Sequence, residues 1–294
     1  MTKTSFIAIV GRPNVGKSTL LNAILGEKIA IVSQKPQTTR NRITGIHTGG
    51  ENQFVFLDTP GMHQPRTRLG DFMVKTTENA IGEVDAAILV VEAREEVGDI
   101  EANLIEHFKK QKLSAILAIN KTDAVNAVNI AKTIKAYADA FPFDAVVPIS
   151  AKHGKGVDTL LQECEQYLAE GPFFFSPDEI TDQPERQIVA EIIREKLLRT
   201  LQEEIPHGVA VVIEEFKEEG KMIRIRAEIY CEKQSHKGII VGKGGVALKT
   251  VGSYAREDLE KFFGVKVFLD LWVKVKEKWR DNIATLNNFG YREE

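Results

Sequence analysis

One stretch of sequence decides the fold of the first half of the chain: Gly11-Arg12-Pro13-Asn14-Val15-Gly16-Lys17-Ser18. It matches the pattern GxxxxGK[ST] and stands between an apolar run and a helical pattern. Glycines let consecutive backbone N–H groups turn inward around phosphate oxygens, and the start of a helix adds partial positive charge. We therefore predict a phosphate-binding loop in which Lys17 reaches the β- and γ-phosphates of a nucleotide and Ser18 ligates Mg²⁺. The alternative, a glycine-rich turn that matches by chance, fits the strand-loop-helix context poorly.

Short apolar runs alternate with helical patterns along the first half. The apolar runs cover residues 6–10, 43–47, 53–57, 86–91, 115–119 and 146–149, and the helical patterns lie near 17–25, 70–82, 99–112, 126–140 and 156–168. Continuous apolar strands are expected where helices cover both faces of a sheet. The alternation predicts an α/β fold, a doubly wound and mostly parallel sheet. The hairpin signal at residues 49–52 makes one edge strand antiparallel.

A second motif, NKTD (120–123), follows a buried apolar run and indicates which base is bound. The Asp123 carboxylate can accept two N–H donors from guanine, whereas adenine offers no such pair. Asn120 can face the other base edge, the Lys121 stem can lie over the ring, and a backbone N–H at Ser150-Ala151 can meet guanine O6. NKTD alone could be a plain strand-end loop. Together with the phosphate-binding loop about 100 residues upstream, it resembles the P-loop GTPases of the translation-factor-related class.

This resemblance implies roles for two further segments. In such GTPases the aspartate of the DTPG segment, here Asp58, holds Mg²⁺ through water, and the backbone N–H of Gly61 meets the γ-phosphate. A generic turn is the alternative for this segment. Residues 37–40 supply candidate switch threonines, of which we favour Thr39 as a Mg²⁺ ligand. The cofactors implied are GTP or GDP and Mg²⁺, the metal being held by Ser18, Thr39 and Asp58.

Met62 follows the DTPG glycine, where Ras-like GTPases place a glutamine that orients the attacking water. A methionine side chain neither donates nor accepts a hydrogen bond usefully, so hydrolysis needs another device. The resemblance implies Asn14 as a ligand for a monovalent cation such as K⁺, which would act like an arginine finger. The alternative is that Asn14 only stabilises the loop. No side chain stands out as a general base, so we expect slow intrinsic turnover.

The predicted nucleotide site combines all of these loops. The residues expected to act in hydrolysis are Lys17, Asn14, Thr39 and Gly61. The residues expected to bind the nucleotide are Gly11, Arg12, Pro13, Asn14, Val15, Gly16, Lys17, Ser18, Thr19, Asp58, Thr59, Pro60, Gly61, Met62, Asn120, Lys121, Asp123, Ser150 and Ala151.

The alternating pattern stops near residue 170, and a segment of different rhythm follows. We expect a GTPase domain over residues 1–170, a turn-rich linker over 171–185 and a second domain over 186–294. In the linker, Phe173-Phe174-Phe175 is expected to pack against a domain surface. The second domain shows helix, strand, strand, helix, strand and helix patterns, with the first helix over 186–203, so a smaller α+β domain is predicted.

The segment Gly242-Lys243-Gly244-Gly245 lies just before a helical pattern and forms a GXXG motif. In KH domains such a loop clamps the backbone of about four single-stranded nucleotides. The apolar run before the motif and residues 249–252 after it fit a helix-GXXG-helix unit, while a plain turn is the alternative. The residues predicted to bind RNA are Lys237, Gly238, Ile240, Gly242, Lys243, Gly244, Gly245 and Lys249.

Over nearly all of its 294 residues the chain resembles the Era family, bacterial GTPases with a C-terminal KH domain. The most specific segments are GRPNVGKSTLLN (11–22), KPQTTR (35–40), DTPGMH (58–63), NKTD (120–123), PERQIVAEIIREK (184–196) and LDLWVKVKEKWR (269–280). The resemblance implies a GTP-binding and GTP-hydrolysing switch that binds the 3′ end of small-subunit (16S) rRNA and assists assembly of the 30S ribosomal subunit. The bound nucleotide is expected to control RNA binding.

Charge is distributed unevenly along the chain. The formal net charge is −3, which at face value argues against a nucleic-acid partner. However, residues 232–280 carry 11 basic and 6 acidic side chains, whereas residues 171–231 carry 8 and 13. The basic excess coincides with the GXXG loop and with Lys274, Lys276, Lys278 and Arg280. A solvated surface is the alternative, but the clustering favours one limited basic face for RNA.

The remaining expectations concern location and partners. Two cysteines in different halves of the chain, without a CxxC pair or a signal peptide, favour a reducing cytoplasm. We expect a soluble monomer, with peripheral contact at the inner face of the cell membrane left open. The main alternative is a P-loop GTPase whose C-terminal domain binds a protein or membrane partner instead of RNA. A small-molecule kinase or ligase would need a separate substrate pocket with acid and base groups, which the sequence does not indicate.

Overall fold

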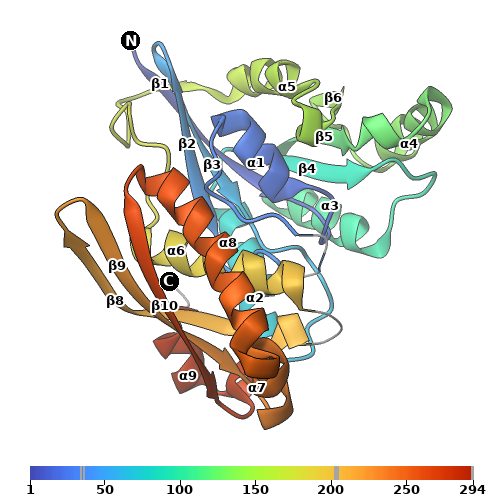
Figure 1. Ribbon diagram of the computed structural model, residues 1–294. Coiled ribbons are helices and arrows are strands. Elements are labelled where there is room, and N and C mark those ends of the chain that lie inside the picture. Colours follow the sequence, from blue (N-terminus) through green and yellow to red (C-terminus); the bar gives the residue numbers. More distant parts are fainter. Residues whose placement is uncertain (34, 36, 202–204, 293–294) are drawn as a thin grey trace. The chain divides into compact units, whose positions relative to one another are not determined.

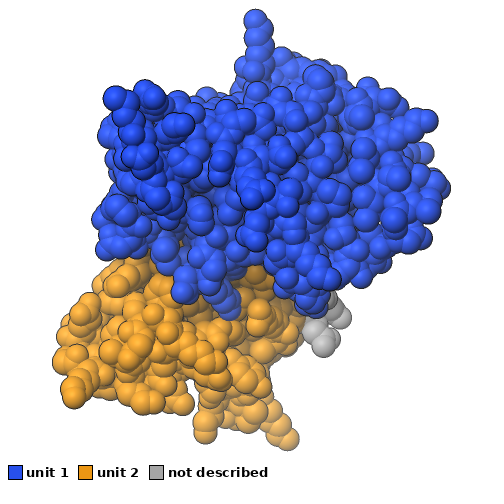
Figure 2. All heavy atoms as spheres, turned by 90° about the horizontal axis from the view of Figure 1, so that it is seen from above, with its two compact units in different colours: residues 1–30, 39–65, 73–182 blue, residues 31–38, 66–72, 183–294 orange. Residues whose placement is uncertain are grey.

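The computed structural model describes residues 1–33, 35, 37–201 and 205–292. Pro36 of the KPQTTR segment and the last residues of the helix expected over 186–203 lie outside this range. The chain forms two compact units, coloured separately in Figure 2. Unit 1 comprises residues 1–30, 39–65 and 73–182, and unit 2 comprises residues 31–38, 66–72 and 183–294.

Unit 1 is built on a sheet with the strand order β2-β3-β1-β4-β5-β6 (Figure 1). All neighbours in this order are parallel except β2, which pairs antiparallel with β3 at the edge, so the predicted doubly wound sheet is confirmed. A two-residue strand, β7, pairs antiparallel with the start of β1 and was not predicted. The strands are β1 Lys3–Val10, β2 Ile43–Gly49, β3 Asn52–Asp58, β4 Ala86–Glu92, β5 Ser114–Asn120, β6 Ala145–Pro148 and β7 Ala169–Glu170.

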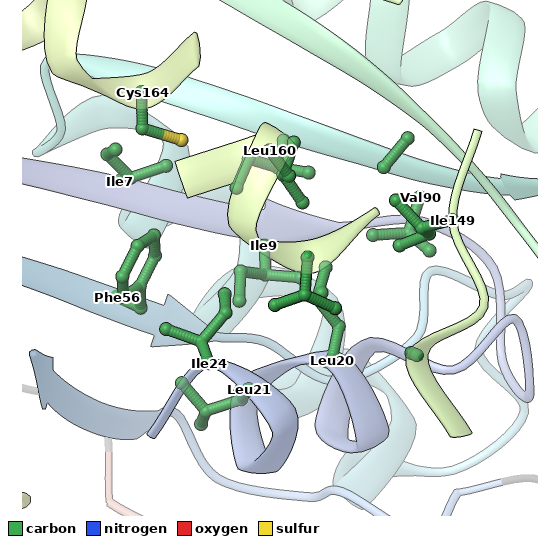
Figure 3. Close-up of a cluster of buried hydrophobic side chains, with 14 of the residues drawn as sticks. Ile7, Ile9, Leu20, Leu21, Ile24, Phe56, Val90, Ile149, Leu160 and Cys164 are labelled. Carbon is green, nitrogen blue, oxygen red and sulfur yellow. The ribbon is translucent and has the colours of Figure 1, made fainter. Parts of the chain in front are cut away.

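Alternate residues of the central strands pack on opposite faces of this sheet. Ile7 and Ile9 of β1 face a cluster with α1 and α5 (Figure 3), whereas Ala8 and Val10 face α2, α3 and α4. Because successive strand side chains point to opposite faces, a strand covered on both sides must be apolar at every position. The helices are α1 Lys17–Leu25, α2 Arg68–Gly82, α3 Asp99–Gln111, α4 Ala127–Ala140 and α5 Val157–Cys164.

The segment that follows β7 continues along unit 1. The Phe174 ring meets Phe6 edge to face, with 5.0 Å between the ring centroids. Gln53 on β3 is fully buried, and its side chain accepts from the backbone N–H of Phe174 at 2.9 Å and donates to the carbonyl of Phe175 at 3.0 Å. The phenylalanine segment therefore packs against a domain surface, as its apolar character predicted.

Unit 2 contains a three-stranded sheet in the order β10-β9-β8, with β10 parallel and β8 antiparallel to β9. Its core is formed by the buried face of this sheet together with α6, α7 and α8. The expected order of elements lacked α7, although the comparison with helix-GXXG-helix units implied it. The elements are α6 Glu185–Thr200, β8 Ala210–Glu219, β9 Met222–Cys231, α7 Gln234–Val241, α8 Val246–Phe263, β10 Lys266–Val275 and α9 Ile283–Asn288.

Among the described residues, no helix combines the length and apolar character that spanning a bilayer requires.

Candidate nucleotide site and nucleic-acid interface

The phosphate-binding loop joins the end of β1 to the start of α1 (Figure 1). Gly16 stands directly before α1 with φ +102°, and a Cβ there would lie 2.2 Å from Nδ2 of Asn120. Only glycine fits both the backbone conformation and this close approach. The loop therefore lies directly against the NKTD motif, which is just over 100 residues further along the chain.

Lys17 is the first residue of α1, and its side chain is only 6% exposed. Its Nζ donates to the carbonyl oxygens of Gly11 at 3.1 Å and Arg12 at 3.0 Å. Burial lowers the pKa of Lys17 to about 8, although the charge of Asp58 opposes the shift. Because the Lys17 ammonium is poorly hydrated and contacts two loop carbonyls, an incoming anion stabilises its charge. This is the property that a phosphate-binding lysine requires.

Three oxygen-bearing side chains converge beside Lys17. The Ser18 hydroxyl donates to Oδ2 of Asp58 at 2.6 Å and lies 2.8 Å from the Thr39 hydroxyl. Asp58 is fully buried at the end of β3, and its Oδ1 has no hydrogen-bond partner among the described residues. Burial raises the pKa of Asp58 to about 6, against the opposing effects of Lys17 and Ser18. A buried carboxylate with an unsatisfied oxygen, beside two hydroxyls, is a hard donor set that fits Mg²⁺.

The DTPG segment is anchored on the sheet and on α2. The Thr59 hydroxyl donates to the carbonyl of Ile9 at 3.0 Å, and the Thr77 hydroxyl donates to the carbonyl of Pro60 at 3.0 Å. The backbone N–H of Met62 donates to the carbonyl of Gly11 at 3.3 Å, and the Met62 side chain packs on the apolar cluster of α3 and α4. Met62 therefore offers a hydrophobic side chain at the position that a glutamine occupies in Ras-like GTPases.

The predicted base-binding loops meet through Asn120. Its Nδ2 donates to the carbonyl of Val15 at 2.7 Å, and its Oδ1 accepts from the backbone N–H of Ala151 at 3.0 Å. The buried Ser150 hydroxyl donates to Oδ1 of Asp123 at 2.5 Å, and this bond is the main cause that holds the pKa of Asp123 below its usual value. Asp123 is thus an ionised acceptor, as the recognition of two guanine donors requires.

Lys121 and Asn14 are also brought together. Lys121 Nζ donates to the carbonyl of Asn14 at 2.7 Å and forms an ion pair with Glu92 at the end of β4. Asn14 itself adopts the left-handed conformation with φ +65°. The predicted base-stacking lysine therefore also ties the base-binding loop to the phosphate-binding loop.

Two acidic residues at this site were missed in the sequence. Glu92 pairs with Lys121, and Glu101 on α3 binds the side chain of Arg12 through both carboxylate oxygens. Glu92 ends an otherwise apolar strand, and that contrast could have flagged it. Glu101 gave no signal, because an acidic residue in the first turn of a helix is ordinarily explained by the helix dipole.

The GXXG loop of unit 2 lies between α7 and α8, as a helix-loop-helix unit requires. Gly242 has φ +73°, and a Cβ there would lie 2.7 Å from the Cβ of Ala247. Lys243 and Lys249 are exposed, and Lys237 is partly exposed, so all three can reach a phosphate backbone. The Ile240 side chain is fully buried in the core of unit 2, so the predicted RNA contact of this residue would have to come from its backbone. The exposed apolar side chain is its neighbour Ile239.

The basic run at the end of the GXXG-containing domain is partly neutralised. Lys274 pairs with Glu228, and Arg280 Nη2 lies 2.5 Å from a carboxylate oxygen of Glu232. The positive charge of this segment is therefore smaller at its surface than the count of basic residues indicates.

Family models and relatives identify both halves of the chain. A model described as a 50S ribosome-binding GTPase matches residues 6–121, and a KH domain model matches residues 204–280. GTPase Era of Thermoanaerobacter sp. (strain X514) is 52% identical over 291 residues, covering 98% of this chain and 96% of its own. GTPase Era of Clostridium acetobutylicum is 50% identical over 292 residues, covering 99% of each chain.

Two solved structures match the full length. Era in complex with MgGDPNP and nucleotides 1506–1542 of 16S ribosomal RNA has a TM-score of 0.96 and 38% identity, with all of both chains covered. An alanine variant of Aquifex aeolicus Era bound to GDP and AlF4⁻ has a TM-score of 0.95 and 38% identity, covering 99% of this chain and all of its own. Since relatives of about 50% identity span almost the whole chain, this chain belongs to the Era family of GTPases.

Proposed function

We propose that this chain is a GTP-hydrolysing switch that binds the 3′ end of 16S rRNA and assists assembly of the 30S ribosomal subunit. The observation that carries the proposal is the full-length likeness to an Era structure that holds MgGDPNP and nucleotides 1506–1542 of 16S rRNA together. The phosphate loop, the guanine-selective loops and the GXXG unit are all present in one chain.

The nucleotide is held by the residues predicted from the sequence. Lys17 binds the β- and γ-phosphates, and Asp123 accepts the two guanine donors, with Asn120 and Ala151 fixing the loops around the base. Ser18, Thr39 and Asp58 would hold Mg²⁺, which when bound neutralises charge on the phosphates. The unsatisfied oxygen of buried Asp58 supports this assignment.

The Met62 side chain cannot orient the attacking water, so hydrolysis must depend on other groups of the site. Asn14, in its left-handed conformation within the loop, is the proposed ligand for a K⁺ ion beside the phosphates. Because Met62 contributes only apolar contacts, Met62→Ala should retain hydrolysis. Complete loss of turnover in that variant would assign Met62 a role that its chemistry does not suggest.

A route from the nucleotide to unit 2 runs through the chain just before Thr39. Residues 31–38 belong to unit 2, where the backbone N–H of Val32 donates to buried Glu195 at 3.1 Å and Arg194 donates to the carbonyl of Thr38. Thr39, the next residue, belongs to unit 1 and contacts Ser18. GTP with Mg²⁺ should order residues 35–42 and the segment after Gly61, and this ordering acts directly on a segment held by α6.

The accompanying proposals follow from the sequence. The GTPase domain covers residues 1–170, the linker 171–185 and the KH domain 186–294, with Lys237, Lys243 and Lys249 binding the RNA backbone. The protein acts as a monomer in the cytoplasm, which suits its two unpaired buried cysteines. Peripheral contact with the inner face of the cell membrane is retained as part of the alternative function.

The test titrates the full chain with an RNA of nucleotides 1506–1542 in the presence of GDPNP or GDP, at several salt concentrations. Affinity should be higher with GDPNP, should fall steeply with salt, and should be lost in Gly242→Asp. Gly220→Asp is the control for the added charge and for a side chain at positive φ, because Gly220 lies in the β8–β9 turn; its surroundings are open, whereas a Cβ at Gly242 would meet Ala247. Equal affinities with both nucleotides would contradict the coupling. No RNA binding, with binding to anionic vesicles instead, would favour the alternative function.

A further inference from the structure

Arg12, the second residue of the phosphate-binding loop, is fixed by a carboxylate from another element. Its Nε donates to Oε1 of Glu101 at 2.5 Å, and its Nη2 donates to Oε2 of the same group. Glu101 lies in the first turn of α3, and its side chain is only 1% exposed. Paired N–H···O bonds of this kind fix the orientation of a guanidinium as well as neutralising it.

The ion pair is closely enclosed. Gly98 caps α3, and a Cβ there would lie 2.4 Å from Nη2 of Arg12 and 2.7 Å from Oε2 of Glu101. Tyr137 of α4 is buried nearby, and burial together with the charge of Glu101 raises the pKa of its hydroxyl. The bond to Glu101 raises the pKa of Arg12. Because the Glu101 carboxylate is almost wholly buried, removing Arg12 would leave a charge that water solvates poorly.

The position of Arg12 bears on two parts of the nucleotide site. Its carbonyl oxygen accepts from Lys17 Nζ at 3.0 Å. The next residue, Pro13, touches the DTPG segment so closely that a Cβ on Gly61 would lie 2.6 Å from the Pro13 nitrogen. A shift of Arg12 therefore moves both a neighbour of the Lys17 ammonium and the surface on which Gly61 rests.

We propose that Glu101 is a positioning residue for GTP hydrolysis, acting through Arg12 to hold the phosphate-binding loop against α3. Lys17 and Gly61 thereby keep their places around the γ-phosphate. The same bonds engage two of the three guanidinium nitrogens, so Arg12 serves as an anchor of the loop rather than as an arginine finger. This inference rests on the GTP hydrolysis proposed above.

The test is a double-mutant cycle on the full chain with Glu101→Gln, Arg12→Gln and the double variant. Each single variant should lower kcat at saturating MgGTP at least tenfold, while KM and the Kd for GDP change less than threefold. If Glu101 acts through Arg12, the double variant should be no slower than the slower single variant. Arg12→Lys keeps the positive charge but cannot form the paired bonds to both oxygens of Glu101. Its kcat should therefore lie between those of the wild type and Arg12→Gln.

Glu106→Gln is the matched control, because Glu106 also lies on α3 but forms an exposed ion pair with Lys109. It should leave kcat unchanged. Multiplicative losses in the double variant would overturn the proposal, because Glu101 would then act independently of Arg12. An unchanged kcat with a lowered Tm would also overturn it and leave the pair a merely structural role. A wild-type chain that does not turn over GTP would instead overturn the proposed function, an outcome that the wild-type control reveals by itself.

Discussion

The two glycine-containing loops of this chain, both predicted to bind phosphate groups, have opposite surroundings. The nucleotide loop is surrounded by fixed atoms: Gly16 lies against Asn120, and Lys17 is almost completely buried. The GXXG loop is open, since a Cβ at Gly244 or Gly245 would meet nothing within 4 Å. Both loops combine glycines with a lysine side chain, but only in the first are the lysine and all the glycines packed closely by other atoms of the chain.

This difference separates two ways of using glycine. In the nucleotide loop, glycine is required because other groups occupy the space of a side chain. In the GXXG loop, Gly242 is the only glycine at which a Cβ would lie within 4 Å of another described residue. Gly244 and Gly245 mainly provide the positive φ angles of the loop. Substitutions should therefore have steep effects in the first loop and graded effects in the second.

The largest effect is expected for Gly16→Ala. The new methyl group would overlap Nδ2 of Asn120, which holds the carbonyl of Val15, and the backbone φ of +102° disfavours alanine as well. Affinity for both GDP and GTP should fall more than 100-fold, as measured by titration with a fluorescent GDP analogue.

The matched control for this variant is Gly26→Ala at the other end of α1. Gly26 has φ +72° but open surroundings, so it carries the conformational strain, about 1–2 kcal/mol, without the overlap. Nucleotide affinity should be unchanged in the control. A similar loss in both variants would show that strain in α1, and not contact with Asn120, decides binding.

The next effect concerns the free energy of unfolding in the absence of nucleotide and Mg²⁺. The buried charge of Asp58 in the nucleotide site should lower this free energy. Burial raises the pKa of Asp58 to about 6, whereas the pKa of an aspartate in the unfolded chain is about 4. The folded chain therefore binds the proton of the Asp58 carboxyl more tightly than the unfolded chain does. The ionised carboxylate therefore costs folding free energy above pH 6, and the cost fades as the pH falls toward 4. Asp58→Asn, free of nucleotide and Mg²⁺, should stabilise the chain by about 1–3 kcal/mol at pH 8 and by roughly half as much at pH 5.

The exposed aspartate on α4, Asp139, provides the control for Asp58. Asp139→Asn should change the free energy of unfolding, measured by urea titration, equally little at both pH values. If Asp58→Asn destabilised the chain at pH 8, the bonds of Asp58 to Ser18 and its attraction to Lys17 would outweigh the cost of burial.

The contrast between the loops also explains what could be predicted from the sequence. The central strands, the phosphate loop and NKTD were predicted correctly as elements, because continuous apolar runs and short motifs are local in sequence. The expected order of elements omits α7, because this helix is only eight residues long and contains Gly238. The two-residue β7 exists only through its pairing with β1.

Contacts between distant residues lay beyond such patterns. The bond between Arg12 and Glu101 joins residues 89 positions apart, so neither side chain shows its partner in the sequence. Ile240 is buried because its face of α7 packs on the core. The sequence of this two-turn helix does not predict that face, because three consecutive residues at its end are apolar. These features depend on tertiary packing, which local patterns constrain only weakly.

A smaller effect is expected for Lys243→Ala in the GXXG loop. Lys243 is exposed, so it should contribute to RNA binding mainly as a point charge near phosphate. Affinity for an RNA of nucleotides 1506–1542 should fall about three- to tenfold, and the slope of log K against log salt should flatten by roughly 0.7. Lys221→Ala, an exposed lysine at the β8–β9 turn, should change neither quantity. An unchanged slope for Lys243→Ala would place this lysine away from the RNA backbone.

The smallest effect is expected for Gly244→Asn, which tests the comparison most directly. Gly244 has φ +61° and ψ +19°, a conformation that asparagine tolerates better than other side chains, and its surroundings are open. Affinity for the same RNA should therefore stay within about twofold of wild type. Gly16→Asn, the same substitution in the nucleotide loop, should abolish nucleotide binding because Asn120 occupies the space. A loss of RNA binding in Gly244→Asn greater than tenfold would mean that RNA approaches this backbone as closely as Asn120 approaches Gly16, so that both loops need glycine for the same reason.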